Sequence, residues 1–571
     1  MKNLISKYLI TASVPGRLGW IFLIFISTTH SFAQLKFSGL GRTVFQSQQL
    51  SGDALKNDSL SDRNTSQGYA LFDLRTNYQI KDKFRILVDT RLKNTIGGFG
   101  GVGISLNLRQ VRIEGLASKF VKYSVGDVDI KMSPFTFSNS SEIELDIEST
   151  IFSRRREVVQ YESFNVNNHW RMRGLKLNSV VNLKGDSNQL KILVFGTTDR
   201  ATDSYTKYPI RIGGSIAFEK KEKFFLEGNM VRTEENQKET GNAQIQVFST
   251  RTWYLKHWKK WALGGTAELG QSNSIRETGV NTTQKLNDYF YEGKCIAINK
   301  NQDWKIWAAY QEVGPFFESP GAQSLRISGN RSSQFFTYVA NNQQIRSQGM
   351  LDRMGSETIQ NINISSFRQP YLPQYNLVFP YGKATPNRKG FDLGLLDINN
   401  RFLDYSFQYH QSGEVLGEGV VEKRSFHLLQ SAFILKINRI LNSNRKRSLY
   451  ANYRFESSGR KGDLPTDLQI NTVDVGATVE IFKKFDLHLG MKRIQAKGNE
   501  VYSQINSYNS ISGYLPYAMT QTENLIGTGI QLHFTDHCFL LVSGYFNRIK
   551  TTEALLSWNL NQLYTNFSYE F

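Results

Sequence analysis

Cysteine, proline and long apolar stretches are scarce in this sequence. Its 571 residues include 2 cysteines and 11 prolines. Two cysteines exclude a framework of disulfide bonds and a zinc site built from cysteine thiolates. Beyond residue 34 no apolar stretch reaches the roughly 20 residues that a helix needs to cross a bilayer, which excludes a bundle of membrane helices.

Aromatic residues and glycine are abundant by contrast. The chain has 38 Phe, 26 Tyr and 45 Gly, with a mean hydropathy of -0.40. A polar chain of this composition favours strands over helices. The formal net charge is +19, but the basic residues are dispersed along the chain, so we expect no nucleic-acid partner.

Residues 1–33 are typical of a cleaved signal peptide. Lys2, Lys7 and Arg17 precede the apolar run 18–26, and small residues follow at Ser31 and Ala33. An uncleaved anchor is the alternative, but the run is too short to span a bilayer. We therefore expect export and cleavage near Ala33, with a single transmembrane β-barrel over residues 34–571.

Apolar and polar side chains alternate with a period of two along much of the chain. Residues 72–80 and 84–93 alternate in this way on either side of the turn Lys81-Asp82-Lys83. The same pattern recurs at 449–456, 485–492, 526–534 and 563–571. Such segments predict hairpins with one apolar face and one polar, frequently charged face.

A soluble sandwich also alternates, and three further features favour a membrane barrel. The polar faces carry long charged side chains, which suit a wet lumen. Short turns alternate with longer loops, as on the periplasmic and extracellular sides of a barrel; we predict the longer loops at 47–67, 233–242, 273–287 and 497–523. Aromatic residues such as Trp261 and Trp304 flank the turns, as in an interfacial girdle.

These patterns predict an all-β fold, a closed antiparallel transmembrane β-barrel of about 22 strands, with a range of 18–24. A change of phase near Arg109-Gln110 predicts a β-bulge there. The expected strands are 35–46, 68–80, 84–94, 104–116, 120–126, 174–183, 190–198, 208–219, 224–233, 243–256, 261–272, 288–299, 304–313, 389–399, 402–412, 424–437, 448–457, 468–481, 485–496, 524–534, 538–547 and 559–571.

Two long insertions interrupt the strands, at 127–173 and 314–388. The second is too long for a bare surface loop and holds six of the eleven prolines. Barrels of this size are normally plugged, so we expect both insertions to fold inward and narrow the lumen. An extracellular cap is the alternative that the sequence leaves open.

The signal peptide, the ladder of hairpins and the terminal strand together resemble Gram-negative outer-membrane β-barrel proteins of the Bacteroidetes type, porin-like or channel-like. The resemblance implies a multi-pass barrel in the cell outer membrane, in contact with outer-membrane lipid and lipopolysaccharide. It also implies that the barrel-assembly machinery recognises a C-terminal signal, here Leu563, Phe567, Tyr569 and Phe571. A weaker similarity to export barrels lies in Val125-Gly126-Asp127 and Arg171-Met172-Arg173-Gly174.

Motifs of catalysis and metal binding are missing from the sequence. It contains no G-x-S-x-G or H-E-x-x-H motif, and its histidines show no ligand spacing. We therefore expect no enzyme activity, no catalytic residues, no metal site and no cofactor.

Charged residues on the polar faces are the candidate site. We expect a lumen lined by Asp73, Arg75, Arg85, Asp89, Arg91, Lys93, Arg454, Glu456, Asp486, His488 and Lys492. In the first insertion, an acidic run and a basic run predict a constriction loop that orients solutes in a transverse field, or else pairs with itself; its members are Glu142, Glu144, Asp146, Glu148, Arg154, Arg155 and Arg156.

Two functions are compatible with such a barrel. The first is a channel or transport pore for small or moderate-sized solutes, with a lumen narrowed by the insertions. The alternative is a component of envelope assembly or protein export that binds envelope proteins through the insertions.

Overall fold

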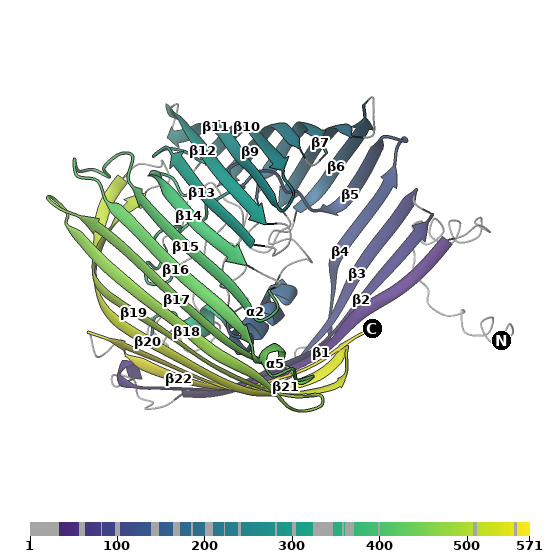
Figure 1. Ribbon diagram of the computed structural model, residues 1–571, viewed down its shortest axis with the longest axis vertical. Helices are drawn as coiled ribbons and strands as arrows, with labels where there is room; N and C mark the ends of the chain where they lie inside the picture. Colours follow the sequence, from purple (N-terminus) through teal and green to yellow (C-terminus); the bar gives the residue numbers. More distant parts are fainter. Residues whose placement is uncertain are drawn as a thin grey trace.

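The computed structural model forms one large closed barrel (Figure 1). It describes residues 33–55, 63–81, 83–96, 103–138, 148–163, 172–183, 187–199, 209–221, 223–237, 241–279, 282–299, 304–323, 346–356, 359, 371–397, 400–505, 511–552 and 557–571. The expected signal peptide, residues 1–33, lies outside this part of the chain except for Ala33 and so stays a prediction.

In the described ranges, 22 strands make one antiparallel sheet in which sequential strands are neighbours. Their bounds are β1 Ala33–Ser51, β2 Arg63–Ile80, β3 Phe84–Ile96, β4 Ser105–Leu116, β5 Val121–Val128, β6 Met172–Asn182, β7 Asn188–Asp199, β8 Ile210–Lys220, β9 Phe224–Gln237, β10 Gly241–His257, β11 Trp261–Gly279, β12 Thr282–Asn299, β13 Trp304–Val313, β14 Arg388–Asp397, β15 Leu403–Gly413, β16 Ser425–Lys436, β17 Arg447–Arg460, β18 Thr466–Phe482, β19 Phe485–Ile505, β20 Ile511–Thr535, β21 Cys538–Thr551 and β22 Trp558–Glu570. Short helices are η1 Asp53–Leu55, α2 Thr150–Ser163, α3 Met350–Gly355 and α5 Ile437–Ile440.

The sheet closes where β1 pairs with β22. The ladder runs from Leu40 opposite Glu570 to Ser51 opposite Asn559. Beyond it, Gly39 and Phe571 exchange two backbone hydrogen bonds of 2.9 and 3.2 Å. Closure pairs the backbone groups that a free edge would expose, which a sheet must do to cross hydrocarbon. The predicted closed all-β barrel is therefore confirmed.

Alternate side chains face outward and inward along each strand. On β1 and β2 the outward Phe45 and Phe72 are 43% and 42% exposed, whereas the inward Arg42 and Asp73 are buried. The exposed large hydrophobic residues recur around the whole wall, as the exterior of a transmembrane barrel requires. None of the helices in the described ranges is long and apolar enough to cross a membrane.

The 22 expected strands match the observed strands one for one, but four predicted loops were wrong. Strands β1 and β2 cover 47–51 and 63–67 of the first of these loops, and β9 and β10 cover most of 233–242. Strands β11 and β12 cover 273–279 and 282–287, and β19 and β20 continue through most of 497–523. Backbone pairing continues past the apolar belt, where the period-two pattern fades.

The predicted bulge is confirmed. Asp89 of β3 pairs with Gln110 of β4, whereas Thr90 pairs with Leu108, so the register skips Arg109. The Arg109 side chain is 3% exposed and reaches the interior of the barrel. A bulge re-aims a side chain in this way.

A hydrophobic core lies inside the barrel, formed by both insertions and the inner wall. Ile151 and Phe152 of α2 pack in one cluster with Met350 and Leu351 of α3 and with Leu377 of the second insertion. The wall contributes inward residues of β16–β22 and β1 to this cluster: Val44, Leu50, Phe426, Leu428, Leu468, Ile470, Ile494, Ala496, Met519, Leu525, Tyr545, Ile549, Trp558, Leu560 and Tyr564. A smaller cluster joins Phe135 and Phe317 to the inner wall of β10–β13.

Candidate functional site

Helix α2 (Thr150–Ser163) lies in the lumen and is held at both ends (Figure 1). Its first turn contacts strands β18–β20. Its last turn contacts charged residues of β1–β4 on the other side of the closing seam. The two contacts differ in their chemistry.

The first turn of α2 packs on glycines. Gly476, Gly490 and Gly527 are direct partners across β18, β19 and β20. A Cβ on Gly490 would lie 2.5 Å from Cγ2 of Ile151, and one on Gly527 would lie 2.9 Å from Cε1 of Phe152. The glycines thus form a groove that a side chain would fill, because only a residue without Cβ lets the helix come this close.

The last turn of α2 lies among arginines. Nη2 of Arg109 donates to the carbonyl oxygen of Tyr161 at 2.6 Å, and Nη1 of Arg91 donates to that of Glu162 at 3.1 Å. The last carbonyls of a helix have no partner within the helix and carry its negative dipole end. Cationic donors from the wall satisfy them and stabilise the helix end.

Asp73 connects these arginines to the helix. Its carboxylate accepts two hydrogen bonds of 2.7 Å from Arg91, one of 2.8 Å from Arg109 and one of 2.8 Å from the Tyr161 hydroxyl. The two guanidinium groups and the phenol thus converge on one carboxylate, which compensates part of the cost of burying these charges. Burial raises the pKa of Tyr161 to about 12, so this phenol stays a donor at neutral pH.

A second carboxylate, Glu162 on α2, faces the seam. It accepts from Arg42 at 3.1 Å and from the Tyr69 hydroxyl at 2.7 Å. Lys93 lies 4.0 Å from the same carboxylate and 4.3 Å from the centroid of the Tyr69 ring. We name the set Arg42, Tyr69, Asp73, Arg91, Arg109, Tyr161 and Glu162 the arginine cluster.

The second insertion is anchored through two wall carboxylates. Glu523 of β20 accepts the backbone N–H of Met350 at 2.5 Å and the Tyr375 hydroxyl at 2.8 Å. Glu456 of β17 accepts the backbone N–H groups of Leu377 and Val378 at 3.3 and 3.1 Å. Burial, followed by the charge of Glu523, raises the pKa of Tyr375 well above its usual value.

The structure places the expected lumen residues on the inner wall, where each contacts a polar partner, although the Arg75 and Arg85 side chains are still 32% and 38% exposed. Arg75 lies 3.5 Å from Asp89, Arg85 donates to Asn77 at 2.8 Å, and Arg454 lies 2.9 Å from Glu456. The other six predicted residues also have partners. Asp486 accepts from His533 at 3.0 Å, His488 lies 3.1 Å from Thr478 and 3.2 Å from Gln531, and Lys492 donates to Glu148 at 3.2 Å. Asp73, Arg91 and Lys93 contact α2 or its partners as described above.

The predicted constriction loop needs a correction. Arg154, Arg155 and Arg156 lie on helix α2, so this half of the element is not a loop. Arg155 donates to Gln46 at 3.0 Å, and Arg156 forms an ion pair with Glu148. Glu142, Glu144 and Asp146 lie outside the described residues, so the transverse field stays a prediction.

The C-terminal residues lie at the closing seam and face outward. Leu563, Phe567, Tyr569 and Phe571 are 39–49% exposed. The Phe571 ring stacks on Phe72 of β2 with centroids 5.5 Å apart, above Gly39 of β1. Their role in assembly stays a prediction.

Sequence reasoning missed the glycine groove and most of the arginine cluster. Arg42 shares the inward parity of Leu40 and Val44, which could have identified it. No local signal pairs Tyr161 or Glu162 with strands that lie more than 50 residues away in the sequence. Within the described ranges, no three His, Cys, Asp or Glu side chains are placed to hold a metal ion.

Comparison with known proteins gives likenesses of fold alone. No protein-family model matches the chain, and no curated protein matches it. OccK5 (OpdH) of Pseudomonas aeruginosa is 8% identical over 94% of this chain and 98% of its own, with a TM-score of 0.35. The ferric citrate transporter FecA is 9% identical over 93% of this chain and 78% of its own, with a TM-score of 0.45. The translocation pore of the usher PapC is 8% identical over 93% and 99%, with a TM-score of 0.34. Scores this low carry no function over to this chain.

Proposed function

We propose that the protein is an outer-membrane β-barrel that conducts or transports small or moderate-sized solutes through a lumen narrowed by its two insertions. The observation that carries the proposal is a closed barrel with an apolar exterior whose interior holds a helix anchored to opposite sides of the closing seam. An apolar exterior requires a lipid environment, and a restricted interior selects what passes.

The inner wall of β7–β12 supplies the polar surface that a solute path needs. It carries the ion pairs Asp199 with Arg211 and Glu227 with Arg251, and Glu292 of β12 forms an ion pair with Lys383 of the second insertion. The Arg251 side chain on the wall is 30% exposed and the Lys383 side chain on the insertion is 37% exposed, so open space lies beside this wall. We propose the path along this wall, away from the apolar side that holds α2 and α3.

Conductance of the purified protein in planar lipid bilayers tests the proposal. The intact chain should give small, ohmic openings, and removal of residues 314–388 should increase the conductance severalfold because α3 and its hydrophobic contacts leave the lumen. Folding of the shortened chain is checked by its heat-modifiable migration on gels. A folded barrel that stays silent with and without this segment would contradict the pore.

The same preparation distinguishes the alternative function. A silent barrel that co-purifies with a stoichiometric envelope protein would favour a role in assembly or export.

A further inference from the structure

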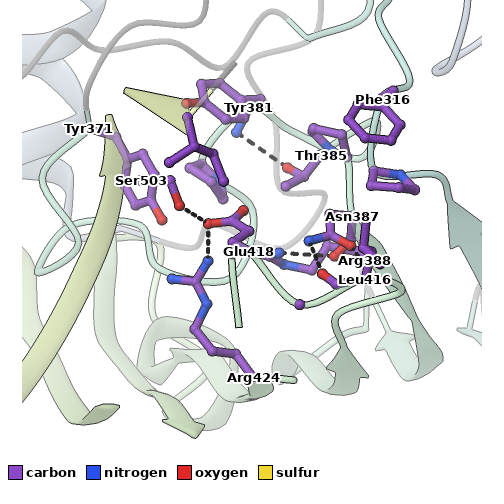
Figure 2. Close-up of a pocket in the computed structure, with 16 residues that line it drawn as sticks. Phe316, Tyr371, Tyr381, Thr385, Asn387, Arg388, Leu416, Glu418, Arg424 and Ser503 are labelled. Carbon is purple, nitrogen blue, oxygen red and sulfur yellow. Dashed lines mark hydrogen bonds and ion pairs between the residues drawn. The ribbon is translucent and has the colours of Figure 1, made fainter. Parts of the chain in front are cut away.

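A pocket of about 220 Å³ opens between the second insertion, the β15–β16 loop and the β19–β20 hairpin (Figure 2). It lies at the barrel end opposite Ala33 and Phe571, where Arg388 begins β14 and Ile511 begins β20. Its volume is below the roughly 300–1,000 Å³ of clefts for drug-sized ligands, so it suits a solute of amino-acid size.

The pocket is preformed by hydrogen bonds of Asn387. Its Oδ1 accepts the backbone N–H groups of Val415 and Leu416 at 3.0 and 2.9 Å, and its Nδ2 donates to the Leu416 carbonyl at 2.8 Å. These bonds fix the β15–β16 loop to the start of β14. Little ordering is therefore left for a ligand to impose.

Arg388 is a buried cation that lacks a carboxylate partner in the described part of the chain. It is 4% exposed, and its guanidinium carbon lies 3.7 Å from the centroid of the Phe426 ring. Its hydrogen bond within the described ranges is from Nη1 to the Asn387 carbonyl at 3.1 Å, and its Nε is buried without a partner there. A buried guanidinium group of this kind is stabilised by a hydrogen-bond acceptor. Arg388 lines the pocket, so a ligand bound in the pocket could supply that acceptor.

The opposite imbalance lies at the neighbouring Arg424. Its guanidinium faces three carboxylates, Glu414 at 2.5 Å, Glu418 at 2.7 Å and Glu500 at 3.0 Å. With Arg388 nearby, three carboxylates lie among two guanidinium groups, which leaves an excess of one negative charge. The Glu414 and Glu500 side chains are fully buried, whereas Glu418 is 27% exposed and lines the pocket (Figure 2).

The remaining wall is aromatic and apolar. Tyr371 and Tyr381 meet edge to face with centroids 5.9 Å apart, and Phe316 is 41% exposed. Pro315, Pro380 and Pro386 complete this side. An apolar ligand side chain would be desolvated there.

We propose that this pocket binds a zwitterionic amino acid, with its carboxylate on Arg388, its ammonium on Glu418 and an apolar side chain against the aromatic wall. A ligand that carries only a negative charge would be repelled by the carboxylates around Arg424. A ligand that carries only a positive charge would supply no acceptor to Arg388. A zwitterion meets both demands. The assignment of this ligand as the transported solute rests on the proposed function, whereas the binding itself does not.

Calorimetric titration of the purified full-length protein in detergent tests the pocket, with L-phenylalanine as the probe. L-phenylalaninamide removes the carboxylate and N-acetyl-L-phenylalanine removes the ammonium. We expect L-phenylalanine to bind and each analogue to bind about tenfold or more weakly, since each loses one charge-assisted contact. Equal affinities for the three compounds, or no binding of any, would overturn the proposal.

Two variants assign the contacts. Arg388→Met should weaken L-phenylalanine binding and abolish its advantage over the amide, and Glu418→Gln should abolish its advantage over the N-acetyl compound. Lys389→Met is the matched control, because Lys389 is the next residue on β14 and is exposed, and it should bind as the parent protein does. Retained discrimination in Arg388→Met would contradict the assignment.

Conductance separates this proposal from the pore. Binding by a barrel that never conducts would keep the pocket and remove the transport role. Conductance without binding would overturn the pocket and leave the pore.

Discussion

The two ends of helix α2 are held by different kinds of interaction. At its first turn, glycines of β18–β20 admit Ile151 and Phe152 to a hydrophobic cluster. At its last turn, Arg91 and Arg109 donate to helix carbonyls and share the carboxylate of Asp73. Shape complementarity fixes one end, and electrostatic compensation fixes the other.

This difference indicates which end of α2 is the easier to detach from the barrel wall. Packing in a groove is insensitive to pH and salt, so only a change of shape disturbs it. A buried charge cluster depends on every member, because the loss of one leaves the others uncompensated. The last turn is therefore the end at which the loss of a single charge or a change of pH should act.

The largest effect is expected for Asp73→Asn. It leaves the buried guanidinium groups of Arg91 and Arg109 without their shared carboxylate, which costs about 3–5 kcal/mol. Hydrogen exchange of the peptide covering residues 157–163 should accelerate strongly, and bilayer conductance should become noisier. Asp467→Asn, on an exposed position of β18, is the control and should change neither. Unchanged exchange in Asp73→Asn would show that the charges do not hold α2.

Gly490→Leu should disturb the packing of the first turn of α2. Its side chain would occupy the space of Ile151, and overpacking of this kind costs about 1–3 kcal/mol. Exchange should accelerate in residues 150–154 first, and the conductance should rise as the turn leaves the wall. Gly293→Leu on β12 is the matched control, because a Cβ there meets no atom within 4 Å and the position faces outward. Equal behaviour of the two variants would remove the glycine groove from the account.

The smallest effect is expected for Tyr161→Phe. It removes one hydrogen bond to Asp73, worth about 1 kcal/mol. Since the pKa of Tyr161 is raised from 10.0 to about 12, the contribution of this phenol is complete below pH 10 and is lost as the pH rises through about 12. The tyrosinate absorbance of the parent protein minus that of the variant should therefore show one phenol titrating near 12, and a midpoint near 10 would contradict its burial.

The strands were predictable from the sequence because each depends on a local period of two. Closure followed from the same pattern, since apolar outward faces such as that of Phe72 and Leu74 require a lipid-facing wall without edges. The ends of the long hairpins were not predictable. Past the apolar belt, as at β19 and β20, pairing continues without a hydrophobic pattern to reveal it.

The interior was predictable only in outline. A run such as Arg154-Arg155-Arg156 indicates a solvated loop, yet Arg155 is 4% exposed on a helix surrounded by wall. The bulge at Arg109 was visible as a change of phase, but its purpose was not, because its partner Tyr161 lies on a distant segment. Contacts between an insertion and a wall have no sequence period.

Disulfide formation between Thr150→Cys and Thr478→Cys tests most directly whether α2 lies inside the barrel. The two hydroxyl oxygens are 3.1 Å apart, close enough for an S–S bond of about 2 Å after small adjustments. In a background with Cys295→Ser and Cys538→Ser, mild oxidation of the folded protein should cross-link the pair in high yield, with a mobility shift that reductant reverses. A folded barrel whose two cysteines stay reduced would contradict the account, because it would place the start of α2 away from the wall.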